Sequence, residues 1–221
     1  VTVTNVNEPP TITSNGGGTT AAVSVAENNT AVTTVTSTDV DASATATYSI
    51  SGGVDAAKFN INSSTGALSF VSAPNYESPT DAGPNNVYDV QVRVSDGSLT
   101  DTQDIAVTVT NVYEQPVITS GAGDTASVNV AENGTAVTTV TSTDVDASAT
   151  ATYSIIGGAD AAKFTIDAST GALSFVSAPD FENKLDAGAN NVYDVTVQVS
   201  DGLGGTDTQA IAVTVTNVNE A

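Results

Sequence analysis

The sequence contains no cysteine, histidine, methionine or tryptophan. Without cysteine, the chain can form neither disulfides nor thiolate metal sites. Without histidine, it lacks the commonest general base and the usual zinc ligand. The common nucleophile–base pairs of hydrolases are therefore excluded. The metal ligands present in number are oxygen atoms, which suit hard cations such as calcium.

Basic residues are also scarce. The chain has four Lys and Arg residues against 25 Asp and Glu, and its net charge is −21. Nucleic acid is not expected as a partner, because phosphate binding needs clustered basic side chains. An anionic membrane surface would repel the chain for the same reason.

Long apolar runs are absent, and none approaches the ~20 residues of a membrane-spanning helix. We therefore expect no direct insertion into a membrane. Residues 1–30 show no signal-peptide pattern, and we expect the sequence to be a segment of a longer polypeptide.

The residues that are present favour β structure. Apolar residues make up 39% of the chain; most are Val, Ala and Ile, accompanied by many Thr, which is typical of strands. Disorder is the alternative for so acidic a chain, but the regular alternation of apolar and polar residues argues against it.

An internal repeat sets the organisation of the chain. The segment AENNTAVTTVTSTDVDASATATYSI, which begins at Ala26, returns almost unchanged at Ala131. The period of ~105 residues corresponds to a whole domain rather than one coil of a solenoid. The sequence predicts a tail strand and linker of a preceding repeat in residues 1–8, a first repeat in 9–112 and a second repeat with its linker in 113–221.

Each repeat shows about seven short strand signals, separated by Gly, Pro, Asn and Asp. Tyr88, Val90, Val92 and Val94 alternate with polar residues and are expected to face a core. An all-β fold of two tandem seven-stranded Greek-key, immunoglobulin-like β-sandwiches arranged end to end fits this pattern best. In the first repeat the expected strands are Thr20–Val25, Ala31–Ser37, Ala46–Ser51, Phe59–Asn62, Ala67–Val71, Val87–Ser95 and Asp101–Asn111.

Acidic residues recur beside the predicted strand ends of both repeats. In a D-x-D segment such as Asp144–Asp146, both carboxylates can face one side. Two like charges about 4 Å apart repel by about 4 kcal/mol at an effective dielectric near 20, and four basic residues cannot neutralise so many acids. A divalent cation could do so. The alternative is that these acids are solvated turn residues, since Asp favours turns.

The order and spacing of these segments resemble a cadherin repeat, in the form found in very large bacterial surface and secreted adhesins. The resemblance covers nearly the whole chain and implies that calcium lies between successive domains. It assigns the ligands at the joint between the two repeats to Glu27, Asn75, Glu77, Asn111, Tyr113 (through its carbonyl), Glu114, Asp144, Asp146 and Asp201. Asn75 and Asn111 stand where the family usually has Asp.

The resemblance also assigns half-sites to the outer ends. The half-site at the amino-terminal end would use Asn7, Glu8, Asp39, Asp41 and Asp96; the half-site at the other end would use Glu132, Asp180, Glu182, Asn217 and Glu220. The remaining acids Asp55, Asp101, Asp104, Asp160 and Asp207 are expected to be surface charge.

The resemblance implies a calcium-dependent structural extender of an extracellular adhesin, secreted or associated with the bacterial cell surface. Its expected partners are calcium and neighbouring repeats of the same chain. A carbohydrate-binding module for polysaccharide, or a homophilic adhesion module, is the alternative. Exposed aromatics for such contacts would be Tyr76, Tyr113 and Phe181. An enzyme is not expected, because paired carboxylates at domain ends, with few aromatics beside them, are poorly placed to hydrolyse a sugar.

Overall fold

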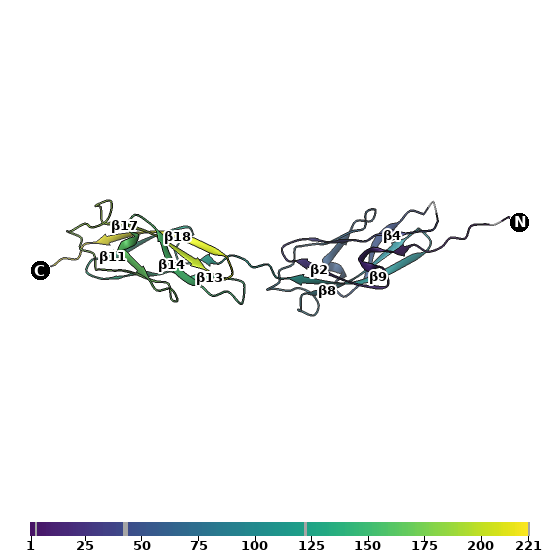
Figure 1. The fold of residues 1–221 in the computed structure, drawn as a ribbon, viewed down its shortest axis with the longest axis horizontal. Helices are drawn as coiled ribbons and strands as arrows, with labels where there is room; N and C mark the ends of the chain where they lie inside the picture. Colours follow the sequence, from purple (N-terminus) through teal and green to yellow (C-terminus); the bar gives the residue numbers. More distant parts are fainter. Residues whose placement is uncertain (3, 42–43, 122, 221) are drawn as a thin grey trace. The chain divides into compact units, whose positions relative to one another are not determined.

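The computed structural model describes residues 1–2, 4–41, 44–121 and 123–220. Within these ranges the chain forms β-strands and three short 3₁₀ turns, and no α-helix. It divides into two compact units, Val1–Val112 and Tyr113–Ala221, which we call the first and second repeat. Figure 1 shows the strands of both repeats, and each repeat has its own buried apolar cluster. The predicted all-β fold of tandem sandwiches is confirmed.

The first repeat is a sandwich of two sheets. One sheet has four strands in the order β2-β9-β8-β5, the other has three in the order β3-β7-β6, and β1 pairs with β4 at the edge. The strands are β1 Thr11–Ile12, β2 Thr20–Ala26, β3 Ala31–Thr34, β4 Ser37–Thr38, β5 Thr47–Gly52, β6 Phe59–Ile61, β7 Ala67–Phe70, β8 Val87–Ser95 and β9 Thr100–Thr110, with 3₁₀ turns η1 Ser14–Gly16 and η2 Ala56–Lys58.

The second repeat has the same topology. Its sheets have the orders β11-β18-β17-β14 and β12-β16-β15, and β10 pairs with β13. The strands are β10 Val117–Ile118, β11 Thr125–Ala131, β12 Ala136–Thr139, β13 Ser142–Thr143, β14 Thr152–Gly157, β15 Phe164–Ile166, β16 Ala172–Phe175, β17 Val192–Ser200 and β18 Thr206–Thr216, with the 3₁₀ turn η3 Ala161–Lys163.

Strict alternation builds the core. Tyr88, Val90, Val92 and Val94 on β8 are at most 1% exposed, whereas the polar residues between them face away from the core. The ring of Tyr88 meets that of Phe70 edge to face, with centroids 5.1 Å apart. The second repeat repeats this arrangement, so the predicted inward face of the sixth strand is confirmed.

Strand direction decides which loops share an end of each repeat. β2 and β9 run parallel, so the residues that follow both strands lie together at what we call the trailing end. β8 is antiparallel to β9 and to β5, and β1 is antiparallel to β4. The residues before β1, between β4 and β5, and after β8 therefore lie at the opposite, leading end. The second repeat follows the same rule.

The expected strand Ala31–Ser37 is in fact two strands. β3 pairs with β7, but β4 pairs with β1, and the break lies at the fully buried Val35. The amide of Val35 donates a 2.8 Å hydrogen bond to the carbonyl of Gly66. Gly66 has a φ of +71°, and a Cβ there would lie 2.0 Å from the Val35 carbonyl oxygen. At this close approach the chain stops pairing with β7, and from Ser37 it pairs with β1 instead.

The expectation that Asp55 and Asp160 are surface charge is wrong. Both side chains are buried, with 4% and 5% of their surface exposed. Asp55 accepts hydrogen bonds from the amides of Ala82 at 2.8 Å and Asp89 at 3.0 Å. Asp160 accepts the equivalent pair in its own repeat. Each of these carboxylates joins the loop before β8 or β17 to the strand itself, because one donor amide lies in the loop and the other in the strand.

Asp101 and Asp207 are half-buried rather than fully exposed. Each accepts a hydrogen bond from the backbone of the short first strand of its repeat, at Ile12 (2.8 Å) and Ile118 (2.7 Å) respectively. Asp104 is exposed, as expected.

None of the described residues forms a helix that is long and apolar enough to cross a bilayer.

Candidate metal centre

The leading end of the first repeat gathers residues from three segments. Because β1 is antiparallel to β4, the chain before β1 meets the Asp39–Asp41 loop. The amide of Glu8 donates a 3.0 Å hydrogen bond to Asp41 Oδ2, and Asn7 Nδ2 donates one of 2.8 Å to Asp96 Oδ2. All of these predicted ligands therefore lie in one cluster, the first leading cluster, which also includes Asn5.

Asn5 was not among the predicted ligands. Its side-chain nitrogen donates a short hydrogen bond to Asp41 Oδ1. The sequence held a signal for it, because Asn5 occupies in the first TNV segment the place that Asn111 and Asn217 occupy in the later copies. Asn111 and Asn217 were predicted as ligands, and Asn5 was not.

Two acids of the first leading cluster are strongly held as carboxylates. The amide of Glu8 is the main cause that lowers the pKa of Asp41, and the Asn5 side chain adds to it. The amides of Leu99 and Ser98, followed by the Asn7 side chain, lower the pKa of Asp96. Both groups are anionic at neutral pH and present acceptor oxygens.

The leading end of the second repeat has the equivalent arrangement, the second leading cluster. The amide of Glu114 donates a 2.8 Å hydrogen bond to Asp146 Oδ2, and the amide of Asp146 donates one of 2.9 Å to Asp144 Oδ1. Asp201 Oδ1 accepts hydrogen bonds from three successive amides of the loop after β17, at 2.7 to 3.0 Å from Leu203, Gly204 and Gly205.

A hollow of about 190 Å³ separates these carboxylates. Asp144, Asp146 and Asp201 all line it. Asp144 Oδ2 is buried and has no hydrogen-bond partner among the described residues, and Asp39 Oδ2 in the first leading cluster is in the same state. A buried carboxylate oxygen without a donor is costly unless a cation lies beside it.

The trailing end of the first repeat is organised by Glu27. This carboxylate is 2% exposed, and it accepts hydrogen bonds from the amides of Tyr76 at 2.7 Å and Val112 at 2.9 Å. An oxygen of Glu77 lies within 4.8 Å of one of Glu27. Glu27 follows β2, Val112 follows the parallel strand β9, and Tyr76 lies in the loop before β8. These three segments meet at the buried carboxylate of Glu27, which we call the first trailing cluster.

The other predicted ligands of the first trailing cluster are exposed. Asn75 Oδ1 accepts a 2.7 Å hydrogen bond from the amide of Ser78, which shapes its own turn. Asn111 directly follows β9 and is exposed. Tyr113 begins the second repeat with 61% of its surface exposed, and its predicted contribution is the backbone carbonyl alone.

The trailing end of the second repeat brings three acids together. Oxygens of Glu132, Asp180 and Glu182 all lie within 4.8 Å of one another. Glu132 is buried and accepts hydrogen bonds from the amides of Phe181 at 2.7 Å and Val218 at 2.8 Å. Three of the acids predicted for this half-site therefore form one cluster, the second trailing cluster.

Amide side chains border the second trailing cluster. Asn217 Nδ2 donates a 2.6 Å hydrogen bond to Glu182, and Asn133 donates a short one to Glu220. A flip of either amide would turn its oxygen toward the acids, because nitrogen and oxygen are interchangeable in shape. Asn133 was not predicted as a neighbour of this cluster.

The candidate ligand atoms in all four clusters suit a hard divalent cation. They are carboxylate, amide and backbone oxygens, the ligands that calcium takes at six to eight positions. The whole chain has four Lys and Arg residues against 25 Asp and Glu. Calcium would supply the missing positive charge; sulfur- or nitrogen-preferring metals find no ligand in a chain without Cys and His.

Comparison with protein families gives one assignment. The model of the cadherin domain matches residues 21–110 and again residues 126–218. The two matches fall one in each repeat.

Individual proteins agree with this assignment. The chain is 31% identical over 194 residues to human protocadherin Fat 1, a match that covers 83% of the chain and 4% of that protein. It is 32% identical over 160 residues to human cadherin EGF LAG seven-pass G-type receptor 2, covering 71% of the chain and 5% of that protein. The chain thus spans only a small part of the length of these relatives.

Solved structures show the same fold. Human protocadherin-24 EC1-2 (crystal form II) superimposes with a TM-score of 0.60 at 20% identity, over 98% of this chain and all of that one. Mouse cadherin-23 EC22-24 superimposes with a TM-score of 0.51 at 23% identity, over 95% of this chain and 65% of that one. At such identities the likeness concerns the fold.

Proposed function

The chain belongs to the cadherin domain family, and from this premise we propose that its repeats are calcium-dependent spacers of a longer adhesion protein. Cadherin repeats are typically extracellular adhesion modules that bind calcium, and they are not enzymes. The proposal adds that calcium at the ends of these particular repeats limits the bending of the array.

One observation carries the proposal. Asp144 Oδ2 is buried without a hydrogen-bond donor, and its carboxylate shares a hollow with those of Asp146 and Asp201. In a chain with four basic residues, no side chain is available to neutralise all of its acids. A bound cation removes both the repulsion and the loss of hydrogen bonding.

We propose that ions are shared between the trailing cluster of one repeat and the leading cluster of the next. Each cluster alone offers only part of the six to eight oxygens that calcium prefers. Extracellular calcium modules typically bind at ~10⁻⁴ to 10⁻³ M, so such sites would be filled outside cells and empty in the cytosol. Filled sites would hold consecutive repeats at a fixed angle.

Small-angle X-ray scattering with and without calcium tests the proposal. The two-repeat chain should give a narrow distribution of interatomic distances in calcium and a broader one after chelation. The variant Asp144→Asn with Asp146→Asn should give the broad distribution under both conditions. Asp104→Asn with Asp194→Asn removes the same charge from two exposed residues outside the clusters and should behave as the unmodified chain.

Identical scattering with calcium and with chelator would contradict the proposal. So would a response to calcium that survives the loss of Asp144 and Asp146. Calorimetric titration of the same samples separates calcium binding from its effect on bending. If calcium binds but the scattering does not change, the repeats bind calcium without controlling the bending of the array.

The parent protein is proposed to be a large surface or secreted adhesin, of the bacterial kind that the sequence resembles. Nearly identical tandem copies without cysteine suit an exported array that folds outside the cell. The relatives named above are mammalian, so the source stays a prediction. Sequencing of the genomic region that encodes this chain, followed by surface labelling of the intact protein, would test it.

Homophilic or polysaccharide binding is the second candidate function. Related cadherins form contacts between copies, and one solved relative is described as a cis-dimer. In this chain, Tyr76 and Tyr113 are partly exposed aromatics, at 37% and 61%. Light scattering at rising concentration, and co-sedimentation with insoluble polysaccharides, would detect these activities.

A further inference from the structure

Each repeat contains a second feature that calcium binding does not explain. In the first repeat a hollow of about 590 Å³ opens between the turn η2, the end of β7 and the loop that leads to β8. Phe70 and Tyr88 form its apolar wall, and Lys58 and Val71 lie at its surface. The volume lies within the range of pockets that hold small molecules.

The second repeat has the equivalent hollow, of about 300 Å³. Phe175 and Tyr193 form its wall, and Lys163 and Val176 take the places of Lys58 and Val71. Asn75, Ser78 and Thr80 line the first hollow, and the second repeat has Asp180, Asn183 and Leu185 at these positions; of these three, Leu185 lines the second hollow. The feature is therefore built by the repeated sequence rather than by one irregular loop.

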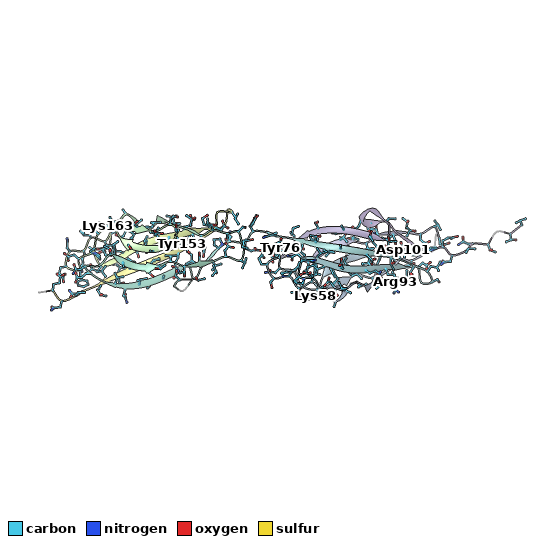
Figure 2. All side chains as sticks on the ribbon, turned by 90° about the horizontal axis from the view of Figure 1, so that it is seen from below. Lys58, Tyr76, Arg93, Asp101, Tyr153 and Lys163 are labelled. Atoms are coloured by element: carbon cyan, nitrogen blue, oxygen red, sulfur yellow. The ribbon has the colours of Figure 1, made fainter. Side chains whose placement is uncertain are left out.

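The charge of the hollow is opposite to that of the chain. Of 25 acidic residues in the sequence, none that the structure describes lines either hollow, whereas two of the four basic residues do. Figure 2 shows Lys58 and Lys163 at the surface of their repeats. Both lysine side chains are exposed, so an anion from solution can reach each ammonium group.

The rim of each hollow also exposes apolar side chains to water. Val71 is 55% exposed, Val176 62% and Leu185 56%. Their exposure beside a buried aromatic wall means that a bound apolar group would remove further apolar surface from water, at about 25 cal/mol per Å². The hollow thus combines an apolar wall and rim with one positive charge.

We propose that each hollow binds a small organic carboxylate with an apolar body. The apolar part would lie against Phe70 and Tyr88 in the first repeat, or Phe175 and Tyr193 in the second. The carboxylate would pair with Lys58 or Lys163. An array of such repeats would carry one site in each copy, and in the first repeat Asn75, a predicted ligand of the first trailing cluster, also lines the hollow.

Proton–nitrogen correlation spectra of the ¹⁵N-labelled two-repeat chain, at constant calcium and ionic strength, test this proposal. Sodium hexanoate is the anionic probe, and hexan-1-ol and sodium sulfate separate the apolar and the charged contributions. Hexanoate, titrated into the millimolar range, should move the amide signals of residues 71–73 and 176–178 in a saturable way. Hexan-1-ol should bind about three- to fivefold more weakly, as expected for the loss of one exposed ion pair, and sulfate should not saturate.

Two variants complete the test. Lys58→Gln with Lys163→Gln should weaken hexanoate binding about three- to fivefold and leave hexan-1-ol binding unchanged. Arg93→Gln removes a positive charge from an exposed residue of β8 outside the hollow and should change neither. The proposal is overturned if hexanoate moves no signals around the hollows, if the alcohol binds as well as the acid, or if Arg93→Gln has the same effect as the lysine variant.

Discussion

The buried carboxylate of Glu132 accepts a hydrogen bond of 2.8 Å from the amide of Val218, and so joins the loop after β11 to the segment after β18. Glu27 makes the same connection to Val112 in the first repeat. A single acid at each trailing end therefore fastens the backbone, and under the proposed function it would also offer charge to an ion. The two tasks can be separated by experiment.

Replacing Glu132 with alanine should destabilise the second repeat even without calcium. The amides of Phe181 and Val218 would lose their acceptor, and the expected loss is about 2–3 kcal/mol of unfolding free energy. Urea unfolding in chelator, followed by near-ultraviolet circular dichroism, measures it. Glu132→Gln keeps one acceptor oxygen and should lose less; equal losses in both variants would show that the hydrogen bonds are unimportant.

Calcium should raise the melting temperature. At a concentration about 100 times the dissociation constant, one site adds about 2.7 kcal/mol, and each kcal/mol corresponds to about 4–8 °C in a domain of about 100 residues. Differential scanning calorimetry in calcium and in chelator measures the shift. In Asp144→Asn with Asp146→Asn most of the shift should vanish, while the melting temperature in chelator stays equal or rises, because repulsion is relieved.

Replacing Asp160 with alanine should destabilise the chain without affecting calcium affinity. Its carboxylate accepts hydrogen bonds from the amides of Ala187 and Asp194 and lies in none of the four clusters. We expect a loss of about 2 kcal/mol with unchanged heat of calcium binding. Chemical unfolding and calorimetric titration of one sample measure both; a fall in affinity would place Asp160 among the ligand-supporting residues instead.

Stability should fall when the pH drops below about 4. Burial acts to raise the pKa of Asp186, but the amides of Asn190 and Asn191 outweigh burial with their hydrogen bonds, and the pKa ends below its ordinary value. A lowered pKa in the folded state means that stability is present above the unfolded pKa and is lost as pH falls through the folded one. Thermal melts from pH 6 to pH 2, in metal-free buffer, should show the loss.

The matched variant for the pH prediction is Asp186→Asn. It cannot titrate, so its stability should change less steeply over the acid range, although it should be lower at neutral pH. A slope identical to that of the unmodified chain would mean that other carboxylates cause the acid loss. Asp81, whose pKa is lowered in the same way despite its burial, is the equivalent residue of the first repeat.

Replacing Gly171 with alanine should strongly destabilise the second repeat. Its φ is +70°, and a Cβ would lie 2.1 Å from the carbonyl oxygen of Val140, so backbone and neighbour must both shift. A loss of more than about 2 kcal/mol is expected. Gly202→Ala is the control: its φ is also positive, at +79°, but the space around it is open, and only the smaller backbone cost should appear.

Much of the fold was predictable because a period of two survives in the long strands. The alternation from Tyr88 to Val94 required a buried face, and the near-identical copy from Ala131 required a second domain. The short strand β1 was not predicted, because two residues carry no periodicity. The break at Val35 depends on its contact with Gly66, which is distant in sequence.

The acids show where sequence reasoning ends. Glu27 and Asp55 are both isolated acids beside small residues, yet only Glu27 was assigned a role, through the family resemblance. Asp55 was mistaken for surface charge because its partners are distant in sequence: the amide of Ala82 lies in the loop before β8, and the amide of Asp89 lies in β8 itself. The spacing of the acids in the sequence indicated which of them could lie close enough together to bind a cation. It could not indicate which acids accept hydrogen bonds from backbone amides.

The parallel pairing of β2 with β9 has a further consequence for a protein stretched between two anchors. The chain enters each repeat at the leading end, next to the start of β2, and leaves it at the trailing end, from the end of β9. Tension on the two ends therefore pulls these neighbouring strands in opposite directions along their own axes. The hydrogen bonds between Thr20–Ala26 and Asp104–Thr110 are then loaded in shear. They carry the force together instead of breaking one after another.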